Sequence, residues 1–137
     1  MIASLKGHLA AKSPQMVVIE VGGIGYEVFI PLSTFSKLPD LEKSVAVHTY
    51  THVREDALQL YGFMDREERD FFLLLISISG IGPRLALNML SGLPVAELAQ
   101  AVELENVDRL KSIPGVGAKT AGRVILELKG KLPSEVF

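Results

Sequence analysis

The first 63 residues carry short runs of β-branched and aromatic residues separated by turn-forming residues, a pattern typical of strands. Glycines at 22, 23 and 25 predict the turn of one hairpin, and Arg54-Glu55-Asp56 predicts the turn of a second. An irregular stretch is expected over 31–40. The predicted strands cover residues 1–12, 16–21, 26–30, 44–53 and 57–63. Five short strands favour a small closed barrel of the OB-fold type.

From residue 65 onward the apolar spacing changes to three or four residues, which indicates helices. Asp65 and Glu68 have the spacing of a capping box, and residues 71–78 are apolar nearly all round, which indicates deep burial. Pro83 suits the first turn of the next helix, and Gly92 its end. The predicted helices cover about 65–78, 83–92, 94–102, 106–112 and 118–129, with Gly130 and Pro133 ending the last.

These two patterns predict an α+β protein with two domains. The first, over residues 1–64, is a five-stranded OB-fold barrel, and the second, over residues 65–137, is all-α.

The helical half contains one phrase twice, 35 residues apart: Ser-Ile-Ser-Gly-Ile-Gly-Pro-Arg at 77–84 and Ser-Ile-Pro-Gly-Val-Gly-Ala-Lys at 112–119. Glycine lets the backbone turn with positive φ and leaves no side chain between the N–H groups and a ligand. Because the first N–H groups of a helix lack partners and the helix dipole is positive there, such a loop favours an anion, above all a phosphate. The alternative is a tight turn between packed helices, but two copies favour a pair of phosphate contacts.

Both copies place a cation, Arg84 or Lys119, two residues after the second glycine, and a further polar residue, Asn88 or Arg123, one helical turn later. Two hairpins related by a pseudo-two-fold axis would match the two strands of a duplex across the minor groove, without sequence specificity. The candidate DNA-binding residues are Gly80, Ile81, Gly82, Arg84 and Asn88 in the first copy and Gly115, Val116, Gly117, Lys119, Thr120 and Arg123 in the second.

The net charge of -2 and the pI of about 5.9 argue against a surface coated in positive charge, but the charge is unevenly distributed. Acidic residues predominate over 65–108, whereas residues 109–131 contain six Lys/Arg and one acid, Glu127. The absence of cysteine excludes disulfides, thiol catalysis and cysteine-bound zinc. The longest apolar run, 71–76, is too short to span a bilayer, and the N-terminus lacks a signal-peptide core, so we expect a cytoplasmic protein with no membrane contact.

The motifs together resemble the RuvA family, the Holliday junction branch-migration proteins of bacteria. The resemblance covers the whole chain and rests on Met-Ile-Ala-Ser-Leu-Lys-Gly at 1–7, the hairpin Val-Arg-Glu-Asp at 53–56, Leu-Tyr-Gly-Phe at 60–63 and the two Gly-x-Gly motifs. The helix-hairpin-helix motifs are shared with many DNA repair proteins, whereas the acidic hairpin ahead of Leu-Tyr-Gly-Phe is more discriminating.

The resemblance implies a non-catalytic homotetramer that binds a four-way (Holliday) DNA junction and holds it open and planar for branch migration by the RuvB ATPase. The processes implied are DNA recombination and repair, including the SOS response to DNA damage. The barrels would meet at the centre, and Glu55 and Asp56 would form an acidic pin that repels phosphates at the crossover. Without the resemblance these two acids indicate only a solvated turn. Further implied partners are a second tetramer, which would make an octamer on DNA, and the RuvC resolvase.

The family has a third, C-terminal domain that is reached through a flexible linker and contacts RuvB. Because this chain ends at Phe137, we expect that domain III is absent from it and that the RuvB contact is lost.

No cofactor and no metal are expected. The phrase Gly-Ala-Lys-Thr at 117–120 lacks the glycines of a nucleotide-binding P-loop. His48 and His52 have helical metal-ligand spacing, but on a strand they would lie about 13 Å apart.

Two other function classes remain as alternatives. A small nuclease or glycosylase could dock through the same hairpins, although no aspartate follows Asp108 and adjacent acids on a hairpin point to different faces. The barrel could instead grip single strands, which needs aromatic stacking platforms. The barrel's aromatic residues are Tyr26, Phe29, Phe35, Tyr50, Tyr61 and Phe63.

Overall fold

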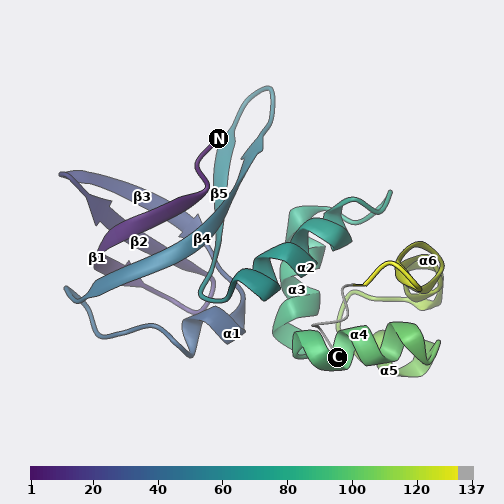
Figure 1. The fold of residues 1–137 in the computed structure, drawn as a ribbon. Helices are drawn as coiled ribbons and strands as arrows, with labels where there is room; N and C mark the ends of the chain where they lie inside the picture. Colours follow the sequence, from purple (N-terminus) through teal and green to yellow (C-terminus); the bar gives the residue numbers. More distant parts are fainter. Residues whose placement is uncertain (133–137) are drawn as a thin grey trace. The chain divides into compact units, whose positions relative to one another are not determined.

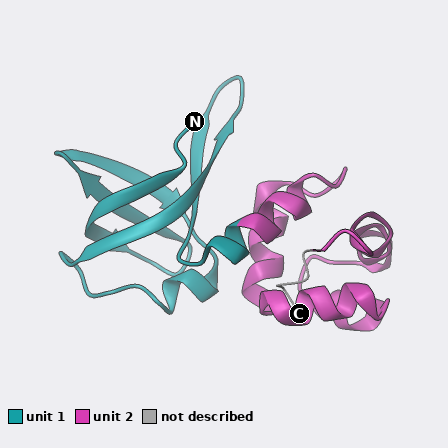
Figure 2. Ribbon diagram, in the orientation of Figure 1, with its two compact units in different colours: residues 1–69 teal, residues 70–137 magenta. Residues whose placement is uncertain are grey.

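The computed structural model describes residues 1–132, and Figure 1 shows its strands followed by its helices. The chain forms two compact units, Met1–Arg69 and Asp70–Phe137 (Figure 2). We expected the domains to divide between residues 64 and 65. The units divide inside helix α2 (Arg66–Ile76), so the first turn of that helix belongs with the barrel.

The first unit is a five-stranded closed barrel with the strand order β1-β2-β3-β5-β4, as the strand pattern predicted. Most pairings are antiparallel, and the parallel pairing of β3 with β5 joins Val28 to Leu60. The strands are β1 (Ser4–Lys12), β2 (Met16–Val21), β3 (Ile24–Phe29), β4 (Ser44–Val53) and β5 (Leu58–Phe63). Gly22 and Gly23, with φ of 60° and 87°, form the two-residue turn between β2 and β3.

The barrel core is closely packed where β5 faces β3. Alternate residues such as Leu9, Val17 and Ile19 are fully buried inside the barrel. A Cβ added to Gly62 would lie 2.6 Å from Cγ1 of Val28, closer than real Cβ contacts allow. Gly62 is therefore required by packing.

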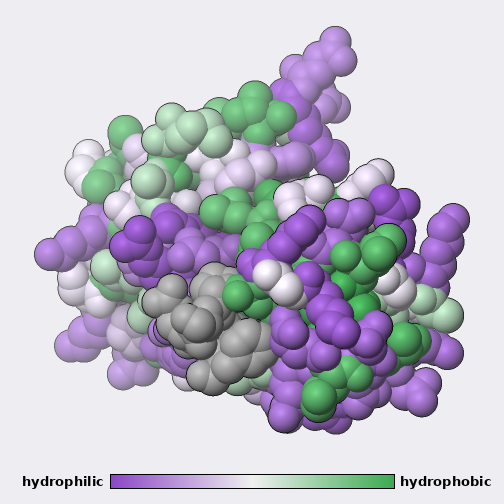
Figure 3. All heavy atoms as spheres, turned by 45° about the vertical axis from the view of Figure 1, so that its right-hand side comes forward, coloured by the Kyte–Doolittle hydropathy of each residue, from purple (hydrophilic) through white to green (hydrophobic). Residues whose placement is uncertain are grey.

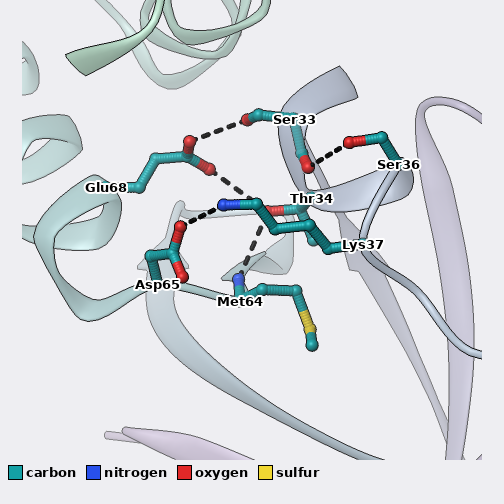
Figure 4. A network of polar contacts seen from close by, with 7 residues as sticks. All are labelled: Ser33, Thr34, Ser36, Lys37, Met64, Asp65 and Glu68. Atoms are coloured by element: carbon teal, nitrogen blue, oxygen red, sulfur yellow. Dashed lines mark hydrogen bonds and ion pairs between the residues drawn. The ribbon is translucent and has the colours of Figure 1, made fainter. Parts of the chain in front are cut away.

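The stretch after Pro31 contains a short helix, α1 (Leu32–Phe35), where we expected irregular chain. Figure 4 shows why local sequence did not reveal it. The hydroxyls of Ser33 and Thr34 donate hydrogen bonds of 2.7 and 3.2 Å to the carboxylate of Glu68. Glu68 lies in α2, more than 30 positions later in the chain. A helix of one turn is marginal by itself, so its stability depends on this distant partner.

The same network gives Glu68 a different role from the capping box that we expected. Its side chain is 7% exposed, and burial raises the pKa of its carboxyl, while hydrogen bonds from α1 act in the opposite direction. Thr34 also accepts a 3.2 Å hydrogen bond from the backbone N–H of Met64, and Lys37 forms an ion pair with Asp65. The first turn of α2 is thereby joined to α1.

From residue 66 to residue 132 the chain forms the five helices expected from the apolar spacing, with ends that differ by a few residues. After α2 these are α3 (Pro83–Gly92), α4 (Val95–Glu103), α5 (Val107–Lys111) and α6 (Ala118–Leu128). Pro83 begins α3 and Gly92 ends it, as predicted. Pro133, expected to help end the last helix, lies outside the described residues.

The helical core is formed by the apolar stripes of these helices. Phe71, Phe72 and Leu75 of α2 are buried, which confirms the deep burial expected there, and Ala121 and Val124 of α6 are buried as well. On the face in Figure 3 hydrophilic residues predominate, and hydrophobic residues form separate patches. Within residues 1–132 no single helix has the length and apolar composition needed to cross a membrane, although α3 and α4, bent by 97° at their break, meet both criteria as a pair.

Candidate nucleic-acid interface

The first glycine of each repeated phrase makes the turn. Gly80 has φ of 93° and Gly115 has φ of 90°, in the region that favours glycine. The second glycines, Gly82 and Gly117, have φ of -92° and -96°, and this extended backbone is open to any residue. We had expected positive φ of the glycine pair. Only the first glycine of each pair needs conformational freedom.

The second glycine instead keeps the start of the following helix open. Gly82 is the N-cap of α3 and Gly117 that of α6, and neither helix start has a side-chain cap hydrogen bond. A Cβ at either glycine would meet nothing within 4 Å. The first-turn N–H groups thus have open space in front of them, where a phosphate oxygen could accept their hydrogen bonds.

The aliphatic residue between the glycines anchors each loop. Ile81 and Val116 are each 5% exposed. Their N–H groups donate 3.0 Å hydrogen bonds to the carbonyls of Ile78 and Ile113 respectively, so the two loops have the same internal turn. Among the predicted DNA-binding residues, these two shape the loops rather than present polar atoms.

Some cations of the helical unit form ion pairs with acidic residues, and others do not. Arg109 donates a 3.0 Å hydrogen bond to Glu97, and Lys129 a 2.8 Å hydrogen bond to Glu105, which raises the pKa of Lys129. The excess positive charge of 109–131 is therefore partly neutralised by Glu97 of α4 and by Glu105, which follows α4. The exposed cations that form no ion pair within residues 1–132 include Lys111 and three others: Arg84, Lys119 and Arg123. The last three had been singled out from the repeat.

The structure brings the two copies of the repeat together. A hollow of about 180 Å³ is formed by the first hairpin loop and by one face of α6. Its lining residues are Ser79, Gly80, Ile81, Lys119, Thr120 and Arg123. Lys119 and Arg123, which belong to the second copy in sequence, thus lie beside the loop of the first.

Ser79 is the lining residue that the sequence reasoning missed. The repeat carried the available signal, because the two copies differ at this position: the second copy has Pro114 where the first has Ser79.

The acidic hairpin joins β4 to β5 and projects from the barrel in Figure 1. Its last strand pair is Val53 with Leu58, and the N–H of Arg54 donates a 2.7 Å hydrogen bond to the carbonyl of Ala57. Glu55 and Asp56 are exposed at the tip, where their carboxylates form no hydrogen bond or ion pair with the described part of the chain. The tip therefore presents two solvent-exposed acidic side chains.

The other candidate groups lie elsewhere on the barrel. His48 and His52 lie on strand β4, as expected. From residue 1 to residue 132 no group of three or more His, Cys, Asp or Glu side chains could hold a metal ion. Among the barrel aromatics, Phe63 and Tyr61 are buried and Tyr26 and Phe35 pack against the core, so few could serve as stacking platforms.

Two family models match the chain. Residues 1–62 match the RuvA N terminal domain, and residues 72–131 match the SAM-like helix-hairpin-helix tandem. The two matches coincide with the barrel and with the helices that carry both hairpins.

Whole-chain relatives cover both units. The "Holliday junction branch migration complex subunit RuvA" of Solibacter usitatus is 53% identical over 134 residues, which is 98% of this chain and 68% of the relative. The protein of the same name from Methylibium petroleiphilum is 52% identical over 136 residues, 99% of this chain and 71% of the relative. That of Albidiferax ferrireducens is 53% identical over 136 residues, 99% of this chain and 72% of the relative.

Proposed function

The chain belongs to the RuvA family, and from that premise we propose that it binds four-way (Holliday) DNA junctions as the non-catalytic subunit of a branch-migration complex. Its relatives carry the name of such a subunit. The motor of the proposed complex is a separate ATPase, RuvB, and RuvC is a further expected partner. The setting is DNA recombination and repair in the bacterial cytoplasm.

One observation carries the proposal: the fold separates two kinds of exposed charge. The helical unit presents Lys119 and Arg123 at a hollow beside a hairpin loop. The barrel presents Glu55 and Asp56 at a projecting tip. Cations beside open helix N-termini attract phosphates, and carboxylates repel them. A junction offers both targets, because its arms are duplexes and its crossover is where strands must be kept apart.

The hairpins are proposed to contact phosphates and not base edges. Gly82 and Gly117 leave the helix N-termini open, and Arg84, Lys119 and Arg123 supply charge. Asn88 and Thr120 add neutral hydrogen-bonding groups, while Ile81 and Val116 set the loop shape. Because phosphates carry no sequence information, binding is expected to be independent of DNA sequence.

A single exposed phosphate contact is weak, since two unit charges 4 Å apart attract by only about 1 kcal/mol in water. We therefore propose a homotetramer that engages the four arms together and holds the junction open and planar. Four equivalent arms call for four equivalent binding units, and linked sites multiply weak contacts. A second tetramer on the opposite face of the DNA would make an octamer.

The test compares a synthetic four-way junction with a linear duplex built from the same arm sequences, across a salt series. We expect tighter binding to the junction at every salt concentration and a mass in solution that corresponds to four chains. Equal affinity for junction and duplex would overturn the proposal. Cleavage of the labelled junction by the protein alone would instead support an enzyme.

The control is the double variant Glu55→Gln with Asp56→Asn, which keeps the hairpin and removes its negative charge. We expect unchanged or higher affinity for the duplex and a smaller preference for the junction, because the repulsion at the crossover is lost. If this variant simply bound both DNAs more weakly, the pin assignment would be wrong.

A further inference from the structure

The projecting hairpin of β4 and β5 has two chemically different faces. Val53 and Leu58, the last strand pair before the tip, are 64% and 62% exposed on one face. On the other face His52 pairs with Gln59, and Nε of Arg54 donates a 3.4 Å hydrogen bond to Nε2 of His52. Because side chains alternate between the two faces of a strand, the hairpin is an amphipathic ribbon with an uncovered apolar face.

This apolar face continues the inner surface of the barrel beyond its rim. Thr51 pairs with Leu60, and both residues are buried. The N-terminal segment closes the barrel at this level, where the N–H of Ile2 donates a 2.9 Å hydrogen bond to Oγ1 of Thr51. Val53 and Leu58 come two residues farther along each strand and so point to the same face. Their exposure shows that packing within the chain does not bury this aliphatic pair.

The charge at the tip restricts what can cover the face. Glu55 and Asp56 are exposed at the end of the same ribbon. Carboxylates repel phosphates, so the sugar-phosphate backbone of DNA is disfavoured there. The bases are uncharged and have flat apolar faces, and aliphatic side chains gain free energy in proportion to the apolar area removed from water. Bases are therefore the part of DNA that this hairpin suits.

We propose that Val53 and Leu58 form an apolar wedge that packs against the faces of base pairs at the crossover of the junction. The inference rests on the proposed function, which puts this hairpin at the crossover. In an open junction the stacking of one arm on another is interrupted, so the last base pair of each arm exposes a face. Aliphatic side chains of other DNA-binding proteins insert beside bases in this way. The tip repels the backbone, and the wedge supports the exposed bases.

A second copy of the hairpin is a poorer partner for this face. Two hairpins packed side by side through Val53 and Leu58 would bring their acidic tips together. Like charges repel most strongly at short range, so this contact would oppose the burial of the aliphatic pair. Base pairs cover the same area without that repulsion.

The test replaces the wedge without changing charge. The wedge variant is Val53→Thr with Leu58→Gln, and the matched control is Ile24→Thr with Leu41→Gln. Ile24 and Leu41 are 57% and 49% exposed elsewhere on the barrel, so the control removes similar apolar surface. The probe is a four-way junction with the fluorescent adenine analogue aminopurine beside the crossover, which brightens when it loses its stacking partner. Wild type and control should raise the fluorescence, and the wedge variant should give about half the rise or less.

The salt dependence of binding separates a base contact from a phosphate contact. We expect the wedge variant to bind the junction about tenfold more weakly, because contact between apolar surfaces is lost. Its salt slope should equal that of wild type, and its affinity for a linear duplex should stay within about twofold, since no phosphate contact is removed. The control variant should match wild type. A lower salt slope, or an equal loss of affinity for the duplex, would overturn the proposal.

Leu58→Gln alone should weaken junction binding by about threefold, and it tests the wedge even where the double variant is unstable. Thermal melts report whether each variant is folded.

The mass of the variants without DNA tests the other occupant of the face. We expect the wedge variant to have the same mass in solution as wild type. A smaller mass would assign the apolar face to a contact between copies of the chain and overturn the base contact. A wild type without junction preference would refute the proposed function and the wedge with it. A wild type that prefers the junction, with a wedge variant that behaves identically, would refute the wedge alone.

Discussion

The hydroxyl of Ser33 donates a 2.7 Å hydrogen bond to the carboxylate of Glu68, which lies 35 positions later in the chain (Figure 4). Through this contact the short helix α1 and the first turn of α2 are joined within the barrel unit. Glu68 is a buried polar residue with hydrogen-bond partners, so the cost of burying its carboxylate is partly offset.

Thr34→Val should destabilise the barrel by about 1–3 kcal/mol, because it leaves a buried carboxylate oxygen and a backbone N–H without a partner. Thr34 donates to Glu68 and accepts from the N–H of Met64. The matched control is Ser36→Ala, whose exposed hydroxyl bonds only the carbonyl of Ser33 and whose loss should change stability by less than about 0.5 kcal/mol. Urea unfolding measures both. Equal effects would show that the Thr34 contacts do not stabilise the fold.

The free energy of unfolding should depend on pH through Glu68. Burial raises the pKa of this carboxyl above 4.5, so the folded protein binds the proton at pH values where the unfolded chain has released it. This contribution to stability is complete below pH 4.5 and is lost as the pH rises through the raised pKa. Measured against Glu68→Gln, which cannot titrate, the wild type should gain stability as the pH is lowered from neutral toward 4.5. A stability difference that stays constant across this range would be evidence against the raised pKa.

The two glycines of the first hairpin should respond differently to alanine. Gly80→Ala should cost about 1–3 kcal/mol in stability, because φ at this position is 93°. Gly82→Ala should leave the melting temperature nearly unchanged, since its backbone is extended and its Cβ meets no neighbour. It should nevertheless weaken DNA binding by obstructing the start of α3. Thermal melts and duplex titrations on both variants separate the two roles, and a Gly82→Ala protein with full affinity would show that nothing approaches that helix end.

Cations that look alike in the sequence should differ in DNA binding. Lys119→Gln should weaken duplex binding and lower the salt slope by about one, because it removes a phosphate contact. Lys129→Gln is the matched control, since Lys129 pairs with Glu105. It should change the slope much less. Titrations over a salt series test this, and identical slopes for the two variants would mean that charge acts through the whole domain and not at the hollow.

Local patterns were sufficient for most elements. Strand β2 and strand β4 have the predicted bounds, and Gly92 ends α3 as expected. These features depend on the spacing of apolar residues and on glycines that end elements, and both act over only a few residues. The short helix α1 was missed for the opposite reason. Its stabilising partner, Glu68, is too far along the chain for any local pattern to reveal it.

The sequence by itself determined the five strands, the five helices from α2 to α6 and the two hairpins, together with the residues that carry charge on them. These features follow from the spacing of apolar side chains and from the positions of glycines, both of which can be read from neighbouring residues. Only the tertiary structure decided that Lys119 and Arg123 face the loop of Gly80, while Leu85 packs by Gly115. The pairing of a charged helix face from one copy with the hairpin loop of the other depends on how the buried faces of the helices pack together. That packing is set by contacts between residues distant in the chain.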